Sequence, residues 1–310
     1  MARFLDLVDG HQELIRQGMD LISRGELSAT HLFSGPSGVQ KKEVALGFAQ
    51  ALLCEQGRQG CGICGSCLRI ARGSSESVRV IEPEKNSIRV EVAREVRQWV
   101  GLQKWGQARI FIFEDAHRLN VQAANLLLKT LEEPPADTYF FLLAPSPRHV
   151  LPTLASRSRV WRFGRVDFSQ VAKWKSSPTW ALNASLGRKD LLLRLLHNKE
   201  NEARQKAWQT LRILLAKSSI LDLGENFAEK SELPDILFWM QSFLRDLMVL
   251  RAGSSQVWNT DFDFQEILHE NRTSEELWRT SQALRELEAQ LNHRDVTLAL
   301  EHLWVSQHGI

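Results

Sequence analysis

The sequence predicts an α/β module, a parallel sheet with helices on both faces, followed by a region made only of helices. Up to about residue 165, short apolar runs alternate with longer stretches of helical spacing. Such alternation is typical of a parallel sheet that helices cover on both sides. From about Asp167 the strand-like runs stop, and only amphipathic helical patterns continue. The C-terminal third is therefore predicted to be an all-helical bundle.

Five runs rich in β-branched and aromatic residues are predicted as strands. They cover residues 31–35, 78–83, 108–115, 139–145 and 159–163. Helical spacing is predicted before the first strand, over residues 5–22, and between later strands, over residues 41–54, 87–103 and 120–135. The last of these helices is closed by two prolines, which cannot continue a helix. In the C-terminal region, helices are predicted over residues 190–219, 233–252 and 274–304, with a break near Asn292.

The composition indicates a soluble globular chain with two or three domains. Of its 310 residues, 43% are apolar and 25% are charged. The net charge of +2 gives no strong electrostatic signature of nucleic-acid binding, so positive surface for DNA would have to be local or supplied by a partner. The N-terminus lacks the pattern of a signal peptide, and no run of about 18 apolar residues occurs. We therefore expect no membrane contact and a cytoplasmic location.

Residues 35–42, "GPSGVQKK", follow the first strand and precede a helix, as a phosphate-binding loop does. Gly35 and Lys41 match the pattern G-x-x-x-x-G-K-[ST], whereas Gln40 replaces its second glycine and Lys42 its hydroxyl residue. A glutamine side chain would crowd a phosphate or strain the turn. A lysine cannot bind Mg²⁺, because an ammonium has only donors. The alternative is a plain strand-turn-helix connection.

The strand at residues 108–115 ends in two acids, Glu114 and Asp115. Nucleotide hydrolases end this strand with aspartate, which helps to hold Mg²⁺, and then glutamate, which positions water. The order here is reversed, so the metal-side carboxylate is one methylene too long and the water-side one is too short. Catalytic geometry tolerates errors of only about 0.5 Å. The alternative is a solvated loop edge, where acids are common.

All four cysteines lie in one short stretch, at Cys54, Cys61, Cys64 and Cys67. Their spacing, C-x6-C-x2-C-x2-C, suits a tetrahedral ion, and the glycines between them permit tight turns. Four protein ligands leave no position for water, so the sequence predicts a structural rather than a catalytic Zn²⁺. Free thiols or a redox pair are the alternatives.

The segment 151–159, "LPTLASRSR", lies between the last two predicted strands. It places Ser156 and Arg157 at the edge of the sheet domain. The planar, permanently charged guanidinium of Arg157 suits the recognition of a neighbour's phosphate. The alternative is an ordinary solvated arginine, which is the default on a protein surface.

Taken in order, these motifs resemble the clamp-loader subunits of bacterial DNA polymerase III, members of the AAA+ superfamily. The most specific segments are "LLKTLEEPP", the buried strand after it and the Ser-Arg pair. The resemblance covers residues 1–165 strongly and the helical C-terminal third more loosely. It implies an AAA+ nucleotide-binding fold with a zinc insertion over residues 1–165. A small helical lid over 166–204 and a helical collar, or oligomerisation domain, over 205–310 would follow.

Within that family, the altered loop and acid pair resemble the delta-prime type rather than the motor gamma/tau subunits. This resemblance implies no intrinsic ATPase activity and no ATP bound in cis at Gly35 and Lys41. It carries the family's Ser-Arg-Cys motif onto Ser156 and Arg157, with Ser158 in place of the cysteine, and implies an arginine finger acting in trans. The implied partners are gamma/tau and delta subunits in a hetero-pentameric ring of the polymerase holoenzyme, which opens the sliding clamp and loads it on primed DNA.

Two other functions remain open from the sequence. One alternative is an active motor ATPase of the same fold, with Glu114 adjusted to hold the metal. The other is a zinc-stabilised module that binds phosphate or DNA backbone. Arg89, Arg94, Arg97 and Lys104, on or near one predicted helix, would then contact DNA, although such charged helical faces are usually only solvated.

Overall fold

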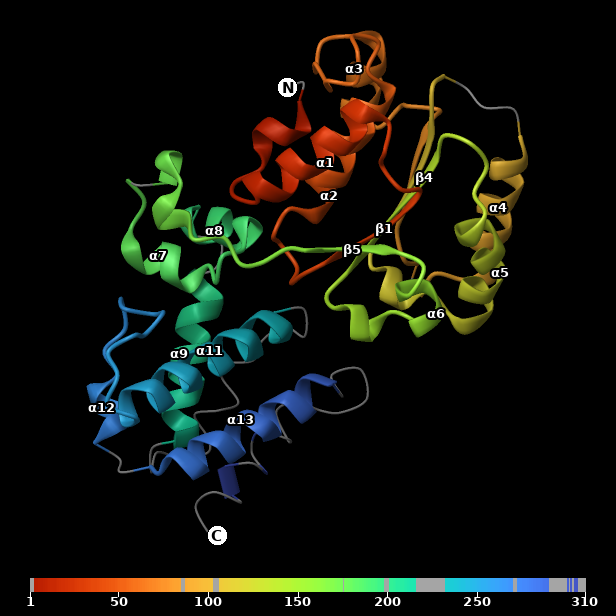
Figure 1. The fold of residues 1–310 in the computed structure, drawn as a ribbon. Helices are drawn as coiled ribbons and strands as arrows, with labels where there is room; N and C mark the ends of the chain where they lie inside the picture. Colours follow the sequence, from red (N-terminus) through yellow and green to blue (C-terminus); the bar gives the residue numbers. More distant parts are fainter. Residues whose placement is uncertain are drawn as a thin grey trace. The chain divides into compact units, whose positions relative to one another are not determined.

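The computed structural model describes most of the chain as two compact units. The described residues are 3–84, 87–102, 106–174, 176–197, 201–215, 232–269, 272–289, 300, 302, 304 and 305. The first unit, here called the sheet unit, comprises residues 1–171 with 187–189; the second, the helical unit, comprises 172–186 and 190–310 (Figure 1). No helix among the described residues is both long and apolar enough to cross a bilayer.

The sheet unit is built on five parallel strands in the order β2-β3-β4-β1-β5. Their bounds are Thr30–Ser34 (β1), Val78–Ile81 (β2), Arg109–Phe113 (β3), Thr138–Ala144 (β4) and Arg159–Arg162 (β5). All five strands predicted from the sequence are confirmed. β1, β3 and β4 are nearly continuous apolar runs, as expected of strands with both faces covered.

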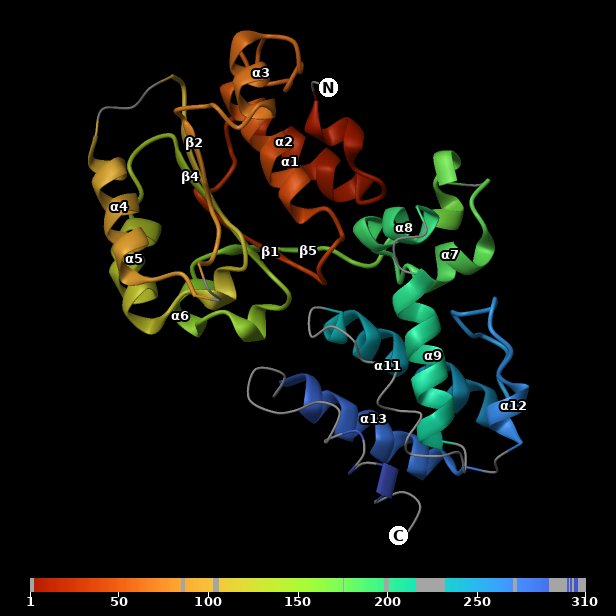
Figure 2. The same cartoon turned by 180° about the vertical axis from the view of Figure 1, so that it is seen from behind.

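Alternate side chains of each central strand enter two separate cores. Phe33 and Ile112 pack with helices α1 (Gln12–Arg24) and α2 (Lys41–Leu53) on one face. Leu32 and Phe111 pack with α4 (Val90–Gly101) and α5 (Val121–Glu132) on the other. The two helical layers lie on opposite sides of the sheet in Figure 2. This separation follows from the two-residue period of a strand. It confirms the predicted α/β class with helices on both faces.

The helices of the sheet unit agree with the predicted ones in the main. They are α1 (Gln12–Arg24), α2 (Lys41–Leu53), α3 (Gly65–Ala71), α4 (Val90–Gly101), α5 (Val121–Glu132) and α6 (Pro152–Ala155), with short 3₁₀ turns η1 (Phe4–Leu7), η2 (Ala116–Arg118), η3 (Pro147–His149) and η4 (Phe168–Gln170). The pattern over residues 5–22 is divided between η1 and α1, because Gly10 and His11 adopt positive φ angles of 83° and 56°. α3 and α6 were not predicted, since they are too short to establish a period.

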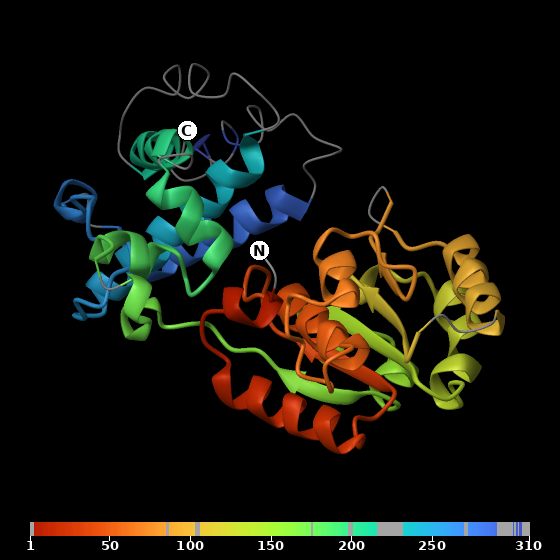
Figure 3. The same ribbon diagram turned by 90° about the horizontal axis from the view of Figure 1, so that it is seen from above.

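The helical unit contains only helices and loops among its described residues. Its elements are η5 (Ala172–Trp174), α7 (Thr179–Ala184), α8 (Lys189–Leu196), α9 (Asn201–Leu215), α11 (Leu233–Arg251), α12 (Gln265–Leu268) and α13 (Ser274–Ala289). α11 packs against both α9 and α13, as Figure 3 also shows. The predicted C-terminal helical region is thus confirmed. The expected break near Asn292 lies outside the described residues.

Candidate functional site

The carboxyl ends of β1 and β3 bring the two altered motifs together at one edge of the sheet. The loop from Gly35 to Gln40 joins β1 to α2, and Glu114 follows β3 directly. A Cβ on Gly35 would lie 2.3 Å from the backbone oxygen of Phe163, so only glycine fits there. In open α/β sheets this edge is where ligands bind.

The side chain of Gln40 forms hydrogen bonds that join the loop to the N-terminal segment around residues 7–9. Its φ of 65° is left-handed, as the glycine of a phosphate-binding loop would permit. The buried side chain accepts a hydrogen bond from the backbone N–H of Asp9 at 2.8 Å and donates one to the backbone oxygen of Leu7 at 2.8 Å. These two hydrogen bonds offset the cost of the left-handed backbone, which is about 1 kcal/mol.

Residues 187–189 make a second set of contacts with the same segment and with the loop. The ammonium of Lys189 lies 2.9 Å from a carboxylate oxygen of Asp9, whose side chain is only 4% exposed. The backbone N–H of Lys189 donates to the oxygen of Gly38, within the loop, at 3.0 Å. The loop is therefore fixed by contacts inside the protein.

Lys41 folds back over its own loop. Its ammonium donates to the backbone oxygens of Gly35, at 2.6 Å, and Pro36. Burial lowers the pKa of Lys41 to about 8, and the charges of Asp115 and Glu43 offset only part of this effect. The lysine of a phosphate-binding loop reaches toward the phosphates; here the loop's own carbonyl groups satisfy it.

We expect the stability of the protein to depend on the titration of Lys41. Between pH 8 and 10.5, the unfolded chain keeps a proton that folded Lys41 releases, so this residue favours folding increasingly as pH rises. Lys41→Met cannot titrate at this position. Relative to that variant, the free energy of unfolding of the unmodified protein should rise by about 1 kcal/mol between pH 7 and 9.5, after discounting for solvent screening. Melting temperatures of both proteins across this range measure the gain. Parallel curves would contradict it.

The ammonium of Lys42 pairs with Glu114 and, at 3.1 Å, with Glu82. Burial raises the pKa of Glu114, and the Lys42 charge offsets only part of this effect. Burial by itself would lower the pKa of Lys42, but hydrogen bonds and charges from the two glutamates raise it overall. A protein cation therefore neutralises the carboxylate that follows β3.

Asp115 does not join this cluster. Its backbone is left-handed, with a φ of 50°, and its carboxylate lies 3.5 Å from Nε of Arg118 and 4.0 Å from Nδ1 of His117. The structure thus brings Lys42 and Glu114 together but directs Asp115 toward the following turn. Glu82 was missed by the sequence analysis, although it follows β2 as Glu114 follows β3, and parallel neighbouring strands end at the same edge.

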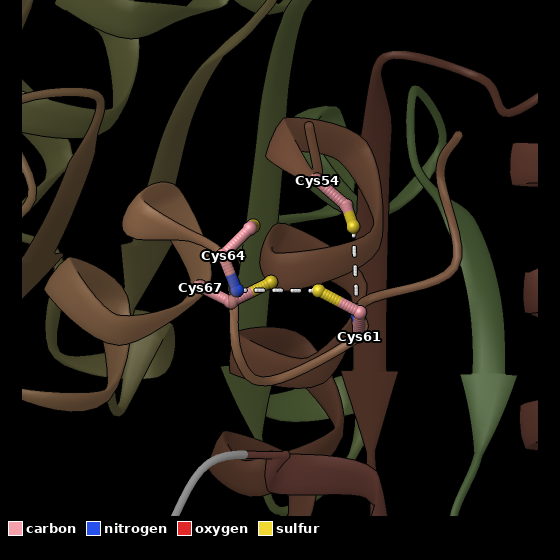
Figure 4. A group of neighbouring side chains, drawn as sticks. All are labelled: Cys54, Cys61, Cys64 and Cys67. Atoms are coloured by element: carbon pink, nitrogen blue, oxygen red, sulfur yellow. Dashed lines mark hydrogen bonds between the residues drawn. The ribbon is translucent and has the colours of Figure 1, made fainter. Parts of the chain in front are cut away.

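The four cysteines form one cluster between α2 and α3 (Figure 4). Their sulfur atoms all lie within 4.8 Å of one another. The backbone N–H of Cys61 points to Sγ of Cys54, and that of Cys64 to Sγ of Cys61, each at 3.4 Å. Tetrahedral zinc with Zn–S bonds of about 2.3 Å needs sulfur atoms about 3.8 Å apart. The cluster therefore fits a four-thiolate metal site.

Removal of a metal from this cluster should be measurable directly. We expect about one zinc per purified chain and near zero after Cys67→Ser, with a melting temperature lower by roughly 5 °C. The expected loss of thermal stability is moderate because α2 keeps its packing against the sheet. Elemental analysis and thermal unfolding, with Ser66→Ala as the neighbouring control, provide the measurement. Metal-free protein of unchanged stability would contradict the prediction.

Ser156 and Arg157 lie on the surface, directly after α6. The Nε of Arg157 pairs with Glu132, the last residue of α5. One terminal nitrogen, Nη1, donates to the backbone oxygen of Thr153 at 3.0 Å and approaches Oγ of Ser156 at 3.4 Å. Glu132 belongs to the "LLKTLEEPP" segment, but nothing local in the sequence links it to Arg157.

The arginines considered for DNA binding lie on or beside α4. Arg89 precedes the helix, and Arg94 and Arg97 are exposed on it. Arg94 pairs with Glu91 at 3.7 Å, which reduces the positive charge of this surface. Lys104 lies outside the described residues.

Comparison with known proteins assigns the chain to a family. The family model described as "DNA polymerase III, delta subunit" matches residues 10–167. DNA polymerase III subunit delta′ of Escherichia coli strain K12 is 31% identical over 223 residues, 68% of this chain and 66% of that protein. Subunit delta′ of Haemophilus influenzae strain Rd is 30% identical over 229 residues, 70% and 69% of the two chains. The chain thus spans about two thirds of the length of these relatives.

A solved structure supports the fold. The crystal structure of a DNA polymerase III gamma subunit-related protein from Thermotoga maritima matches with a TM-score of 0.51 and 19% identity, covering 95% of this chain and 98% of that one. Its likeness extends over both units of the present chain. From the family match and the two relatives, we conclude that this chain belongs to the delta′ subunit family of DNA polymerase III.

Proposed function

We propose that this chain is a non-hydrolysing clamp-loader subunit, which supplies Arg157 to the ATP site of an adjacent motor subunit. The observation that carries the proposal is the ion cluster of Lys42, Glu114 and Glu82. Lys42 stands where a phosphate-binding loop has its metal-binding hydroxyl. Its ammonium already pairs with the carboxylate that follows β3, so Mg²⁺ would meet a repelling charge and a neutralised ligand.

The contacts made by the loop also argue against nucleotide binding by this chain itself. Gln40 and Lys189 hold it to the segment around Asp9, and Lys41 is bonded to the loop's own carbonyl groups. A bound nucleotide would have to break the hydrogen bonds from Lys41 to these carbonyl groups, and no Mg²⁺ bound at Lys42 would compensate for them. Hydrolysis would also need the reversed Glu114 and Asp115 to exchange roles. These obstacles are independent, which argues against an active motor subunit.

Arg157 lies on the surface of the sheet unit. Its permanently charged guanidinium suits recognition of a phosphate, and its Nη2 has no hydrogen-bond partner among the described residues. An arginine offered in trans stabilises the charge that develops during phosphoryl transfer. We propose that Arg157 acts in this way on ATP held by a gamma/tau neighbour, with Ser156 shaping the same turn.

The proposed setting is a hetero-pentameric, cytoplasmic ring with gamma/tau and delta subunits, which opens the sliding clamp and places it on primed DNA. In this setting residues 1–165 form the AAA+ module, 166–204 the lid and 205–310 the collar that joins the subunits. The four cysteines would bind a structural Zn²⁺. Membership of the delta′ family supports this assignment.

Reconstitution tests the proposal. The chain should co-purify with gamma/tau and delta subunits, and the complex should hydrolyse ATP with clamp and primed DNA faster than the mixture lacking this chain. The isolated chain should show no Mg²⁺-dependent hydrolysis, and Lys41→Ala should not change the rate of the complex. Hydrolysis by the chain alone that Lys41→Ala abolishes would instead identify a motor subunit. Salt-dependent DNA binding by the chain alone would favour a DNA-binding module.

A further inference from the structure

We propose that Glu132 is a positioning residue for Arg157, holding the guanidinium so that one terminal nitrogen is presented to a phosphate outside the chain. This inference rests on the proposed function of Arg157 and adds a second residue to it. The two residues are 25 positions apart in the sequence and meet because α5 packs against α6.

Three contacts fix one side of the guanidinium. Its Nε–H donates to the carboxylate of Glu132, and Nη1 contacts the backbone oxygen of Thr153 and Oγ of Ser156. Among the residues that the structure describes, Nη2 has no hydrogen-bond partner. Because the five N–H groups of a guanidinium lie in one plane, fixing Nε and Nη1 also fixes where Nη2 points.

The carboxylate is itself held on a rigid element. Glu132 ends α5, whose Leu127 and Leu131 are buried in the core of the sheet unit. The two prolines at 134 and 135 prevent the helix from continuing. A group on the end of an anchored helix positions its partner better than a group on a loop does. Arginine otherwise loses about 2 kcal/mol of side-chain entropy on becoming ordered, and this pair reduces that loss.

The ion pair contributes little to folding. The side chains of Arg157 and Glu132 are 38% and 41% exposed, and surface pairs of this kind stabilise a protein by about 1 kcal/mol at most. A variant at Glu132 should therefore fold normally. An effect on the motor subunit's ATPase would then report on the orientation of Arg157 rather than on stability.

Glu133 provides a matched control. It is the next residue in the same segment and is exposed, and its carboxylate makes no hydrogen bond or ion pair with the described part of the chain. In the reconstituted complex with clamp and primed DNA, Glu132→Ala should lower kcat about fivefold at the ATP site that receives Arg157, the equivalent of about 1 kcal/mol, with little change in KM for ATP. Glu132→Gln, which keeps an acceptor for Nε–H, should recover part of the rate, and Glu133→Ala should match the unmodified complex.

The decisive experiment uses the double variant Glu132→Ala with Arg157→Ala. If Glu132 acts only through Arg157, Glu132→Ala should have no further effect in an Arg157→Ala background. A further fivefold loss there would overturn the inference, as would an unchanged or faster rate for Glu132→Ala alone. An unchanged rate for Arg157→Ala alone would instead refute the proposed function on which the inference depends. The two failures are therefore distinguishable.

Discussion

Replacing Arg157 with alanine is expected to lower the DNA- and clamp-stimulated ATPase rate of the reconstituted complex. The loss should be about 10³-fold at the ATP site to which Arg157 is supplied. The guanidinium would stabilise the negative charge that develops on the transferred phosphoryl group. The loss should fall on kcat, because the interaction strengthens in the transition state. If other sites in the ring remain active, single-turnover measurements isolate the affected one.

Arg148 is the control for this substitution. It is also an exposed arginine of the sheet unit, and its guanidinium makes no hydrogen bond or ion pair with the described residues. Arg148→Ala should leave the rate unchanged, whereas both variants should join the complex normally by size-exclusion chromatography. An intact complex with a normal rate at every site would refute a role for Arg157 in trans.

Replacing Arg204 with alanine is expected to destabilise the helical unit by about 3–5 kcal/mol. The side chain is 2% exposed, and its terminal nitrogens donate to Asp261 at 2.9 and 2.8 Å and to Asn259 at 3.1 Å. The guanidinium carbon lies 4.8–5.0 Å from the ring centres of Trp180, Trp239 and Phe262. Removing the side chain leaves a cavity among these three rings and takes away the donor to the buried oxygen of Asn259, and Asp261 loses its ion-pair partner.

The same helix offers a matched control. Arg212, also on α9, pairs with Glu266, but both side chains are more than 40% exposed. Arg212→Ala should therefore cost about 1 kcal/mol or less. Urea unfolding followed by tryptophan fluorescence and circular dichroism measures both variants. Equal losses at the two positions would contradict the argument that burial, rather than pairing alone, makes Arg204 important.

Much of the sheet unit could be predicted from the sequence because its signals are local. The buried strands are continuous apolar runs, and α2 and α5 have clear helical spacing between strands and turns. The four cysteines were also grouped correctly, since short spacing with glycines limits how far apart they can lie. Short elements such as α3 and α6 were not predicted, because they give no period in the sequence.

The partners of the candidate residues could not be predicted in the same way. Sequence reasoning expected Gln40 to crowd or strain the loop; the structure gives it a left-handed backbone but directs its side chain to residues 7 and 9. Lys189 reaches Asp9 across 180 positions, with no local pattern to mark the pair. Glu82 and Glu132 are ordinary acids in the sequence and acquire their roles from neighbouring strands and helices.

The sequence by itself therefore determined which groups are present: a loop with a lysine in place of a metal-binding hydroxyl, a reversed acid pair, four clustered cysteines and a Ser-Arg pair. These features are covalent or local, and their chemistry does not depend on distant residues. Only the tertiary structure decided that Lys42 neutralises Glu114 and that Glu132 holds Arg157. Such pairings depend on which strand and helix ends the parallel sheet brings together, because charge interactions act through space and weaken with distance.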